Sequence, residues 1–185
     1  MRTTAAIAIY AGLGLAFPLT ASADAAKPAK SDAELIASAE SAAPAAIAKD
    51  AGVVVMDDKG MRTLRKSNNG WICTPDDPGT PGQDPMCADP NAWAWLQALM
   101  AHQNPPDKVG FMYMLKGGSD ASNMDPYASE VPKGSHWVTT GPHVMVVGPA
   151  VKAMSGYPRV ADPDTSKPYV MFPGTPYEHL MVPVK

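Results

Sequence analysis

Apolar and polar residues alternate in short runs over most of this chain, a pattern that is typical of β-strands. The N-terminal half has three such runs, at 53–56, 61–66 and 71–73, and the turn-forming stretches 57–60 and 67–70 separate them. Because each stretch ends in Gly, we expect the three runs to form a meander of antiparallel strands.

The second half of the chain repeats this texture with longer interruptions. The expected strands are 109–115, 136–140, 143–147, 169–172 and 178–182. Two long stretches, 116–135 and 149–167, show no regular pattern. Loops of this length within a domain are usually functional or loosely ordered.

Two helices are predicted from their start signals. Ser31 and Glu34 have the spacing of a capping box, and Pro44 should kink or split the helix that follows because proline lacks the amide donor. Asp89 followed by Pro90 is a second helix start, for a helix that runs to about residue 102.

The apolar face of the second helix is indicated by residue spacing. Trp93, Leu96 and Met100 recur at i, i+3 and i+7, with Leu99 beside them, so we expect this stripe to face the core. Trp95 falls off the stripe, and its expected place is at the rim or against the sheet.

Together these elements predict an α+β domain. We expect a small, mostly antiparallel sheet of short strands with two or three helices. The 20 Pro and 15 Gly residues indicate long loops between them.

The first 25 residues have the layout of a secretory signal peptide. A positive start is followed by an apolar run too short to span a membrane, and then by Ala-x-Ala cleavage sites. We therefore expect a single globular domain, 26–185, that is periplasmic or extracellular and has no membrane span. The net charge of −3 and the scattered Lys and Arg argue against nucleic acid as a partner.

The chain has two cysteines, Cys73 and Cys87. In an oxidising compartment such a pair favours a disulfide, which for a loop of about 15 residues contributes about 3 kcal/mol. A reactive or metal-binding thiol pair is the alternative, although the C-x-x-C spacing of redox catalysts is absent.

The sharpest motif is His-x-Met, which occurs in two expected strands. Side chains alternate along a strand, so His143 and Met145 share one face, and so do His179 and Met181. The valines and leucine between them would then form the opposite, core face. If the strands pair in register, two imidazoles and two thioethers meet on one surface. Candidate additions are Met112, Met114 and His136.

Thioether and imidazole ligands together select Cu(I) over harder metal ions. The 12 Met residues of the chain are a large supply of such ligands. In residue types only, and over three short strands, the pattern resembles the periplasmic copper and silver chaperones that use Met, His and a neighbouring Trp. The resemblance implies copper as the cofactor or cargo.

Other interpretations of the same residues stay open. Met is a common core filler, and strands buried on both faces would look the same without a metal. Ser119 or Ser122, with a nearby His and Asp120 or Asp125, supplies the residue types of a hydrolase site on the 116–135 loop. Calcium is a weaker alternative, because the acidic loop at 117–125 fails the EF-hand spacing, and Asp162 with Asp164 has no better support.

The sequence therefore predicts an exported binding protein with a soft-metal site. The alternatives are a hydrolase and an envelope scaffold or interaction protein without chemistry. Pro-flanked loop tyrosines, Tyr127, Tyr157 and Tyr177, would suit a small ligand or an envelope protein as partner. The oligomeric state is not indicated by any pattern.

Overall fold

The computed structural model describes residues 30–57 and 60–184 of the chain. The expected signal peptide, 1–25, lies outside the described residues. In the part that is described, no helix is long and apolar enough to cross a membrane.

The described chain contains ten strands, three α-helices and one 3-10 helix. The strands are β1 (Gly52–Asp57), β2 (Gly60–Arg65), β3 (Ile72–Thr74), β4 (Met86–Ala88), β5 (Gly110–Met114), β6 (Gly118–Asp120), β7 (Val138–Thr140), β8 (His143–Val147), β9 (Tyr169–Met171) and β10 (His179–Pro183). The helices are α1 (Asp32–Glu40), α2 (Ala45–Ala48), α3 (Pro90–Met100) and the 3-10 helix η1 (Pro149–Ala153).

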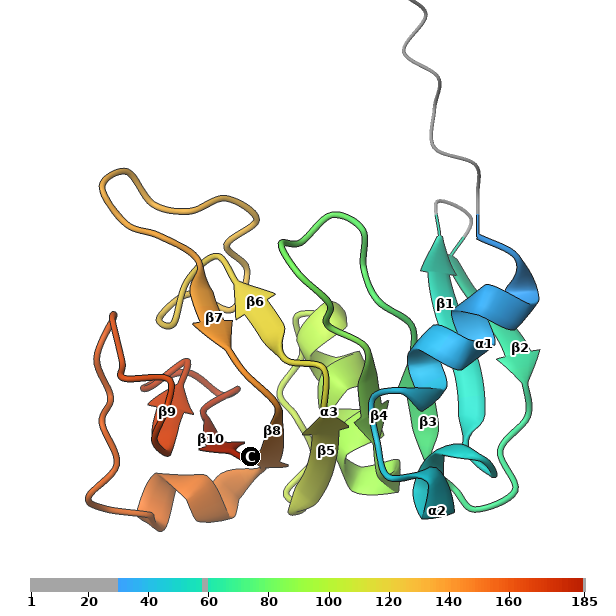
Figure 1. Ribbon diagram of the computed structural model, residues 1–185. Coiled ribbons are helices and arrows are strands. Elements are labelled where there is room, and N and C mark those ends of the chain that lie inside the picture. The colour runs from blue at the N-terminus through green and yellow to red at the C-terminus, as the bar shows by residue number, and fades with distance from the viewer. Residues whose placement is uncertain (1–29, 58–59, 185) are drawn as a thin grey trace, which may run out of the picture.

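Eight of the strands form one twisted sheet in the order β2-β1-β3-β4-β5-β8-β10-β9 (Figure 1). The α+β class and the mostly antiparallel pairing are confirmed. The expectation of a small sheet is wrong, because the two halves of the chain join edge to edge where β4 pairs with β5. A separate two-stranded ribbon of β6 and β7 extends from the sheet.

The expected meander at the N-terminal edge is only half right. β1 and β2 form the antiparallel hairpin, but β3 pairs with β1 in parallel and not with β2. The chain after β2 crosses back over the end of β1, where Asn68 N–H donates to the Asp50 carbonyl. The following strand therefore enters on the other side of β1, in the same direction.

The helix boundaries follow local chemistry. Ser31 and Glu34 form the capping box of α1, and Pro44 separates α1 from α2 as the N-cap residue of α2. At α3, the Asp89 carboxylate accepts from Ala92 N–H at 2.8 Å, which satisfies a donor that the helix leaves free. These three expectations are confirmed.

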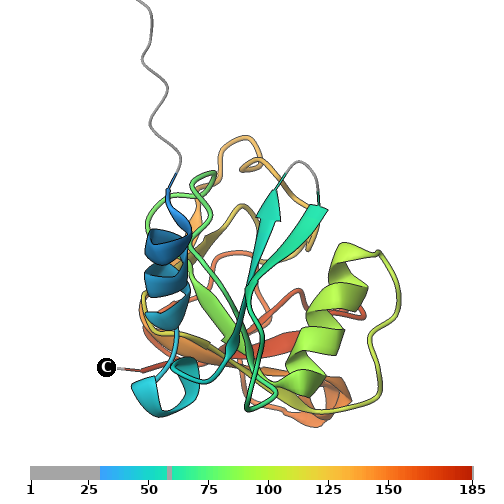
Figure 2. The ribbon, with the colours of Figure 1, turned by 90° about the vertical axis from the view of Figure 1, so that its right-hand side faces the viewer.

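The helices lie on both faces of the sheet. Figure 2 shows α1 on one side of the strands and α3 on the other. The alanines of α1 and α2 pack with Val53, Cys73 and Cys87. The expected disulfide is present: Cys73 and Cys87 face one another across β3 and β4, with an S–S distance of 2.05 Å.

The predicted stripe of helix α3 is right in part: Leu96 and Leu99 pack against the main core, but the most buried large side chain of the helix is that of Trp95, which takes the place against the sheet. Trp95 is buried, whereas Trp93 is only half-buried and Met100 is exposed. The reason is Gly110 on β5, where a Cβ atom would lie 2.7 Å from Ala92 Cα. This close approach places Ala92 and Trp95 on the inner side of the helix.

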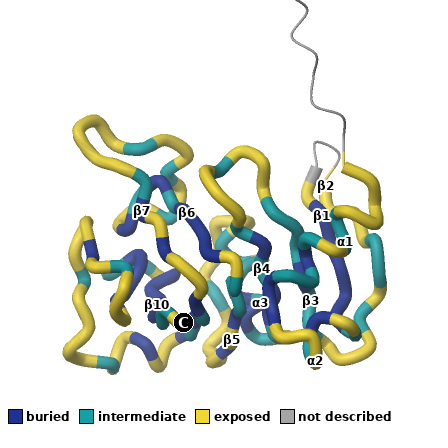
Figure 3. Tube along the Cα trace, viewed as in Figure 1, coloured by how far each residue is buried: buried dark blue, intermediate teal, exposed yellow. Residues whose placement is uncertain are grey.

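The main core lies between α3 and the strands at the centre of the sheet, where Figure 3 shows buried backbone. The His and Met side chains of β8 and β10 point into it. The opposite face, expected to be the core face, carries a smaller cluster of Val170 and Leu180 beneath Val151 of η1. Both faces are covered, and the histidine face is the more buried one.

The two long stretches expected to be irregular contain short ordered elements. Strand β6 lies within 116–135, and η1 lies within 149–167. Ser119 of β6 pairs with Thr139 of β7 within the ribbon, and the hydrogen bond between the Thr140 and Tyr169 hydroxyls links the ribbon to the main core.

Candidate functional site

Three methionines stand in one row across the centre of the sheet. Met145 on β8 lies opposite Met112 on β5 and, on its other side, opposite Met181 on β10. Directly paired residues share a face, and neighbouring strands are about 4.8 Å apart. The three side chains are 6, 1 and 1 % exposed, so three thioethers form a buried row.

The two histidines lie on opposite sides of this row, displaced along the strands. His143 precedes Met145 by two residues and lies opposite Met114, and His179 lies opposite Met171. Because β8 and β10 run antiparallel, the sulfur atoms meet in the middle and the imidazoles lie on either side of them. The two His-x-Met motifs therefore share one face, with their methionines directly paired.

Both imidazoles are held in the same way. His143 Nδ1 lies 2.7 Å from the Gly141 carbonyl oxygen, and His179 Nδ1 lies 2.9 Å from that of Tyr177. A carbonyl oxygen only accepts, so each Nδ1–H donates and each Nε2 keeps its lone pair. In metal-binding histidines of proteins, a hydrogen bond of this kind from the nitrogen that does not bind the metal orients the ring.

The Nε2 atom of His143 is buried and has no hydrogen-bond partner within the described residues. An unpaired buried acceptor costs about 1–3 kcal/mol, and native structures contain few of them. Such an atom, in a side chain that is 1 % exposed, needs a reason to be there. A ligand bound at Nε2 would supply that reason.

Burial keeps both rings uncharged. It lowers the pKa of His143, against the opposing effect of the hydrogen bond to Gly141. Burial likewise lowers the pKa of His179 to about 4, and the charge of His143 adds to that shift. Neutral imidazole is the form that binds metal ions, so both rings are ready as ligands at neutral pH.

A cavity of about 1100 Å³ opens onto these side chains. It lies between the histidine face of the sheet, helix α3 and the segment that joins β3 to β4. Eight methionines line it: Met56, Met86, Met100, Met112, Met114, Met145, Met171 and Met181. The wall opposite the sheet is apolar and is formed mainly by Trp93, Trp95, Leu96 and Leu99 of α3.

One carboxyl group also lines the inner part of this cavity. Asp120 of β6 is partly buried, and burial, with a smaller effect from Asp84, raises its pKa to about 6. A carboxylate whose charge is disfavoured in this way would gain from a cation nearby.

Gly118 lies in close contact with the Met114 thioether and the His143 ring. A Cβ atom at Gly118 would lie 2.8 Å from Met114 Cε and 3.5 Å from His143 Cε1. The absence of a side chain at this position therefore lets the Met114 thioether and the His143 ring approach the same point.

His136 is the one sequence-predicted ligand that the structure places elsewhere. Its side chain is exposed and lies 3.3 Å from Asp162, away from the residues that line the cavity. The other six candidate ligands, on β5, β8 and β10, all line it. Sequence reasoning missed Met86 and Met171, although strand alternation from Val170 would have placed Met171 on this face.

The residues of the alternative hydrolase site lie near one another without forming a triad. Ser119, Asp120 and His143 line the same cavity. The Ser119 hydroxyl is bonded to that of Thr139 at 3.1 Å, and Ser122 accepts from the backbone of its own loop. Across residues 30–57 and 60–184, no serine hydroxyl is hydrogen-bonded to a histidine.

The acidic candidates for calcium are occupied by other partners. Asp164 binds Ser166 and Lys167, and Asp125 accepts from Tyr127 N–H. Within the described ranges, no group of three or more His, Cys, Asp or Glu side chains is placed to hold a metal ion.

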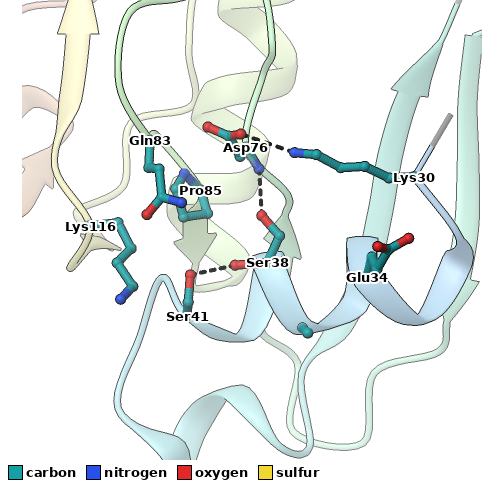
Figure 4. Close-up of a pocket in the computed structure, with 9 residues that line it drawn as sticks. Lys30, Glu34, Ser38, Ser41, Asp76, Gln83, Pro85 and Lys116 are labelled. Carbon is teal, nitrogen blue, oxygen red and sulfur yellow. Dashed lines mark hydrogen bonds and ion pairs between the residues drawn. The ribbon is translucent and has the colours of Figure 1, made fainter. Parts of the chain in front are cut away.

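A second cavity, of about 360 Å³, lies on the other side of the β3–β4 segment, against α1 (Figure 4). Lys30 pairs with Asp76 at 3.1 Å, and Asp76 N–H donates to Ser38 Oγ. These polar groups thus bind one another. None of the described residues that line this cavity has a buried, unpaired atom comparable to the Nε2 of His143.

The chain matches no family model, and no curated protein or solved structure matches it.

Proposed function

We propose that this protein binds a soft monovalent metal ion, Cu(I), in the cavity beneath α3, and that it acts in the cell envelope or outside the cell. The observation that carries the proposal is the buried, unpartnered Nε2 of His143 next to the thioether row of Met112, Met145 and Met181. Soft sulfur with neutral imidazole is the ligand set that favours Cu(I).

The charge of the ligands supports a monovalent ion. Thioethers and neutral imidazoles carry no charge, so they cannot offset the cost of burying a dication. A single positive charge is less costly, and the Asp120 carboxyl can compensate part of it. The cavity lining also carries more negative than positive side chains, which favours a cation. Its further acidic residues are Asp76, Asp77 and Asp84, and its basic residues are Lys30 and Arg62.

The surroundings of His143 favour tighter Cu(I) binding than those of His179. There Met114 lies directly opposite His143, Met145 follows His143 by two residues on the same face, and the lack of a side chain at Gly118 admits the Met114 thioether beside the His143 ring. The His179 ring is instead packed between Trp95 and Phe172, with centroid distances of 5.2 and 5.3 Å. We therefore assign His143 as the principal ligand and His179 as the weaker one.

The test is a competition for Cu(I) between the purified protein and a coloured chelator of moderate affinity. Ascorbate keeps the copper as Cu(I) without the thiol reductants that would attack the disulfide. Wild type should withdraw one ion from the chelator, His143→Ala should lose most of that ability, and the double variant with His179→Ala should lose all of it.

Matched variants separate ligation from folding. His136→Ala removes an exposed imidazole far from the cavity and should bind as wild type does. Met145→Leu keeps the apolar volume but removes a sulfur atom, so it should weaken binding without unfolding the core. If wild type leaves the chelator complex intact, the proposed function is wrong.

A small apolar molecule is a second candidate ligand. The cavity is larger than one ion requires, and its wall of Trp93, Leu96 and Leu99 is typical of small-molecule sites. Binding of a hydrophobic dye that survives Met145→Leu and His143→Ala, together with no copper uptake, would favour this candidate.

A further inference from the structure

Two exposed methionines line the outer part of the same cavity. Met56 on β1 is 55 % exposed, and Met100 at the end of α3 is 42 % exposed, yet both belong to the cavity wall. They come from different elements, the hairpin at the sheet edge and the helix that covers the cavity. Thioethers thus continue from the buried row to the surface.

A third exposed methionine joins them. Met61 on β2 pairs directly with Met56 and is 53 % exposed. Directly paired residues on antiparallel strands have Cβ atoms about 5 Å apart on the same face. The two sulfur atoms can therefore approach one another across the hairpin, although neither side chain gains from burial in a core.

We propose that Met56, Met61 and Met100 form an entry site that captures the soft ion at the mouth of the cavity and passes it to the buried methionines. This inference rests on the proposed function. The ligand chemistry is that of a soft monovalent cation, Cu(I) or Ag(I), which exchanges between neutral thioethers.

The transfer is a ligand exchange without redox change. A bond from the ion to an outer sulfur breaks as a bond to an inner sulfur forms, and no proton or electron moves. Met86 and Met114 also line the cavity and are half-buried, so they offer further sulfur ligands between the exposed methionines and the buried row. The imidazole of His143 is the final ligand, so the ion moves from weaker to stronger binding.

The experiment measures the rate of loading separately from the affinity. Wild type and the triple variant Met56→Leu/Met61→Leu/Met100→Leu are mixed in stopped flow with a Cu(I)–chelator complex, and release of the chelator is followed. The triple variant should load about tenfold more slowly, while its equilibrium affinity stays within about twofold of wild type.

Met124→Leu is the matched control. Met124 is 42 % exposed, as Met100 is, but it does not line the cavity. This variant should load at the wild-type rate. Leucine has a similar volume at all four exposed positions, so each variant should fold.

A second measurement reads the methionines directly. With 13C-methyl-labelled methionine, NMR during Ag(I) titration should show the methyl groups of Met56 and Met61 in fast exchange and those of the buried row in slow exchange. Outer methyl groups that never respond to Ag(I) would reject the entry site.

The outcomes distinguish the two proposals. Wild type that binds Cu(I), with a triple variant that loads equally fast, overturns the entry site and leaves the proposed function intact. An affinity loss as large as the rate loss also overturns it, since the outer methionines would then belong to the holding site. Wild type that takes up no Cu(I) overturns the proposed function and this inference with it.

Discussion

Trp95 meets His179 edge-on, with ring centroids 5.2 Å apart and ring planes inclined by 73°. Phe172 approaches the same imidazole from another direction, and the Tyr177 carbonyl holds its Nδ1. These contacts fix the direction of the His179 ring. The covering helix and the candidate site are therefore one packed unit, and stability and binding can be tested together.

Replacing Trp95 should destabilise the protein strongly. The side chain is 2 % exposed, and Trp95→Ala should cost about 3–5 kcal/mol of unfolding free energy because it leaves a large cavity. Trp93→Ala is the control, because Trp93 is half-buried at the cavity wall and should cost less. Urea unfolding of both variants checks this, and an equal cost for the two would contradict the assigned helix face.

The buried face of α3 could not be predicted from the sequence, although other features could. Strand positions and the His-x-Met alternation could be predicted, because both depend on the period of a strand and on nearby turns. The buried side of α3 could not, since it is decided by Gly110, which lies far along the chain from Trp95 and admits the helix backbone. Apolar spacing alone favoured Trp93.

The order of the strands in the sheet could be predicted only in part, for the same reason. Local turn chemistry indicated the hairpin of β1 and β2, but the parallel pairing of β3 with β1 depends on contacts between segments separated in sequence. The cavity was also beyond local reasoning, because its walls come from α3, the β3–β4 segment and the sheet. Met171 could have been assigned by alternation within its expected strand, whereas no strand was expected at Met86 before β4 was placed.

Two buried groups should give opposite pH dependences of stability. The pKa of His179 falls to about 4 in the folded state, so the unfolded chain binds the proton first. The contribution of neutral His179 to the free energy of unfolding is complete above the ordinary pKa of 6.5. As the pH falls from 6.5 toward 4, about 3 kcal/mol of this free energy is lost. The pKa of Asp120 is raised to about 6, so its ionisation lowers stability as the pH rises from 3.8 to 6.

Asp120→Asn should therefore reveal the histidine effect. The variant should be more stable than wild type at neutral pH and should lose stability more steeply on acidification, because the opposing carboxyl has gone. Urea unfolding at a series of pH values measures both slopes. Adding His179→Leu should flatten the curve again, and identical curves for wild type and Asp120→Asn would reject this assignment.

Metal binding should tolerate mild acid. Burial lowers the pKa of His143, and it lowers the pKa of His179 to about 4. Protons therefore compete poorly with the ion for both rings. The decline in Cu(I) affinity on acidification should therefore lie below the ordinary histidine value of 6.5. Chelator competition at each pH measures this, and a decline centred at the ordinary histidine pKa would show that these rings are not the ligands.

Gly118→Ala should weaken metal binding while leaving the fold intact. The added Cβ would meet Met114 Cε at 2.8 Å, and the flexible end of that side chain can move away. The Met114 sulfur would then leave the space beside His143, so Cu(I) affinity should fall by about tenfold, or about 1.4 kcal/mol. Gly141→Ala is the control, because a Cβ there meets nothing within 4 Å.

Gly110→Ala should be far more damaging than either of these glycine variants. Its Cβ would press on the backbone of Ala92, which cannot move without lifting α3 from the sheet. We expect a loss of more than about 3 kcal/mol, at the upper end for overpacked cores. Thermal unfolding, followed by near-ultraviolet circular dichroism of Trp95, reports both the loss and the displaced helix. An unchanged signal and midpoint would mean that α3 does not rest on β5 as the structure shows.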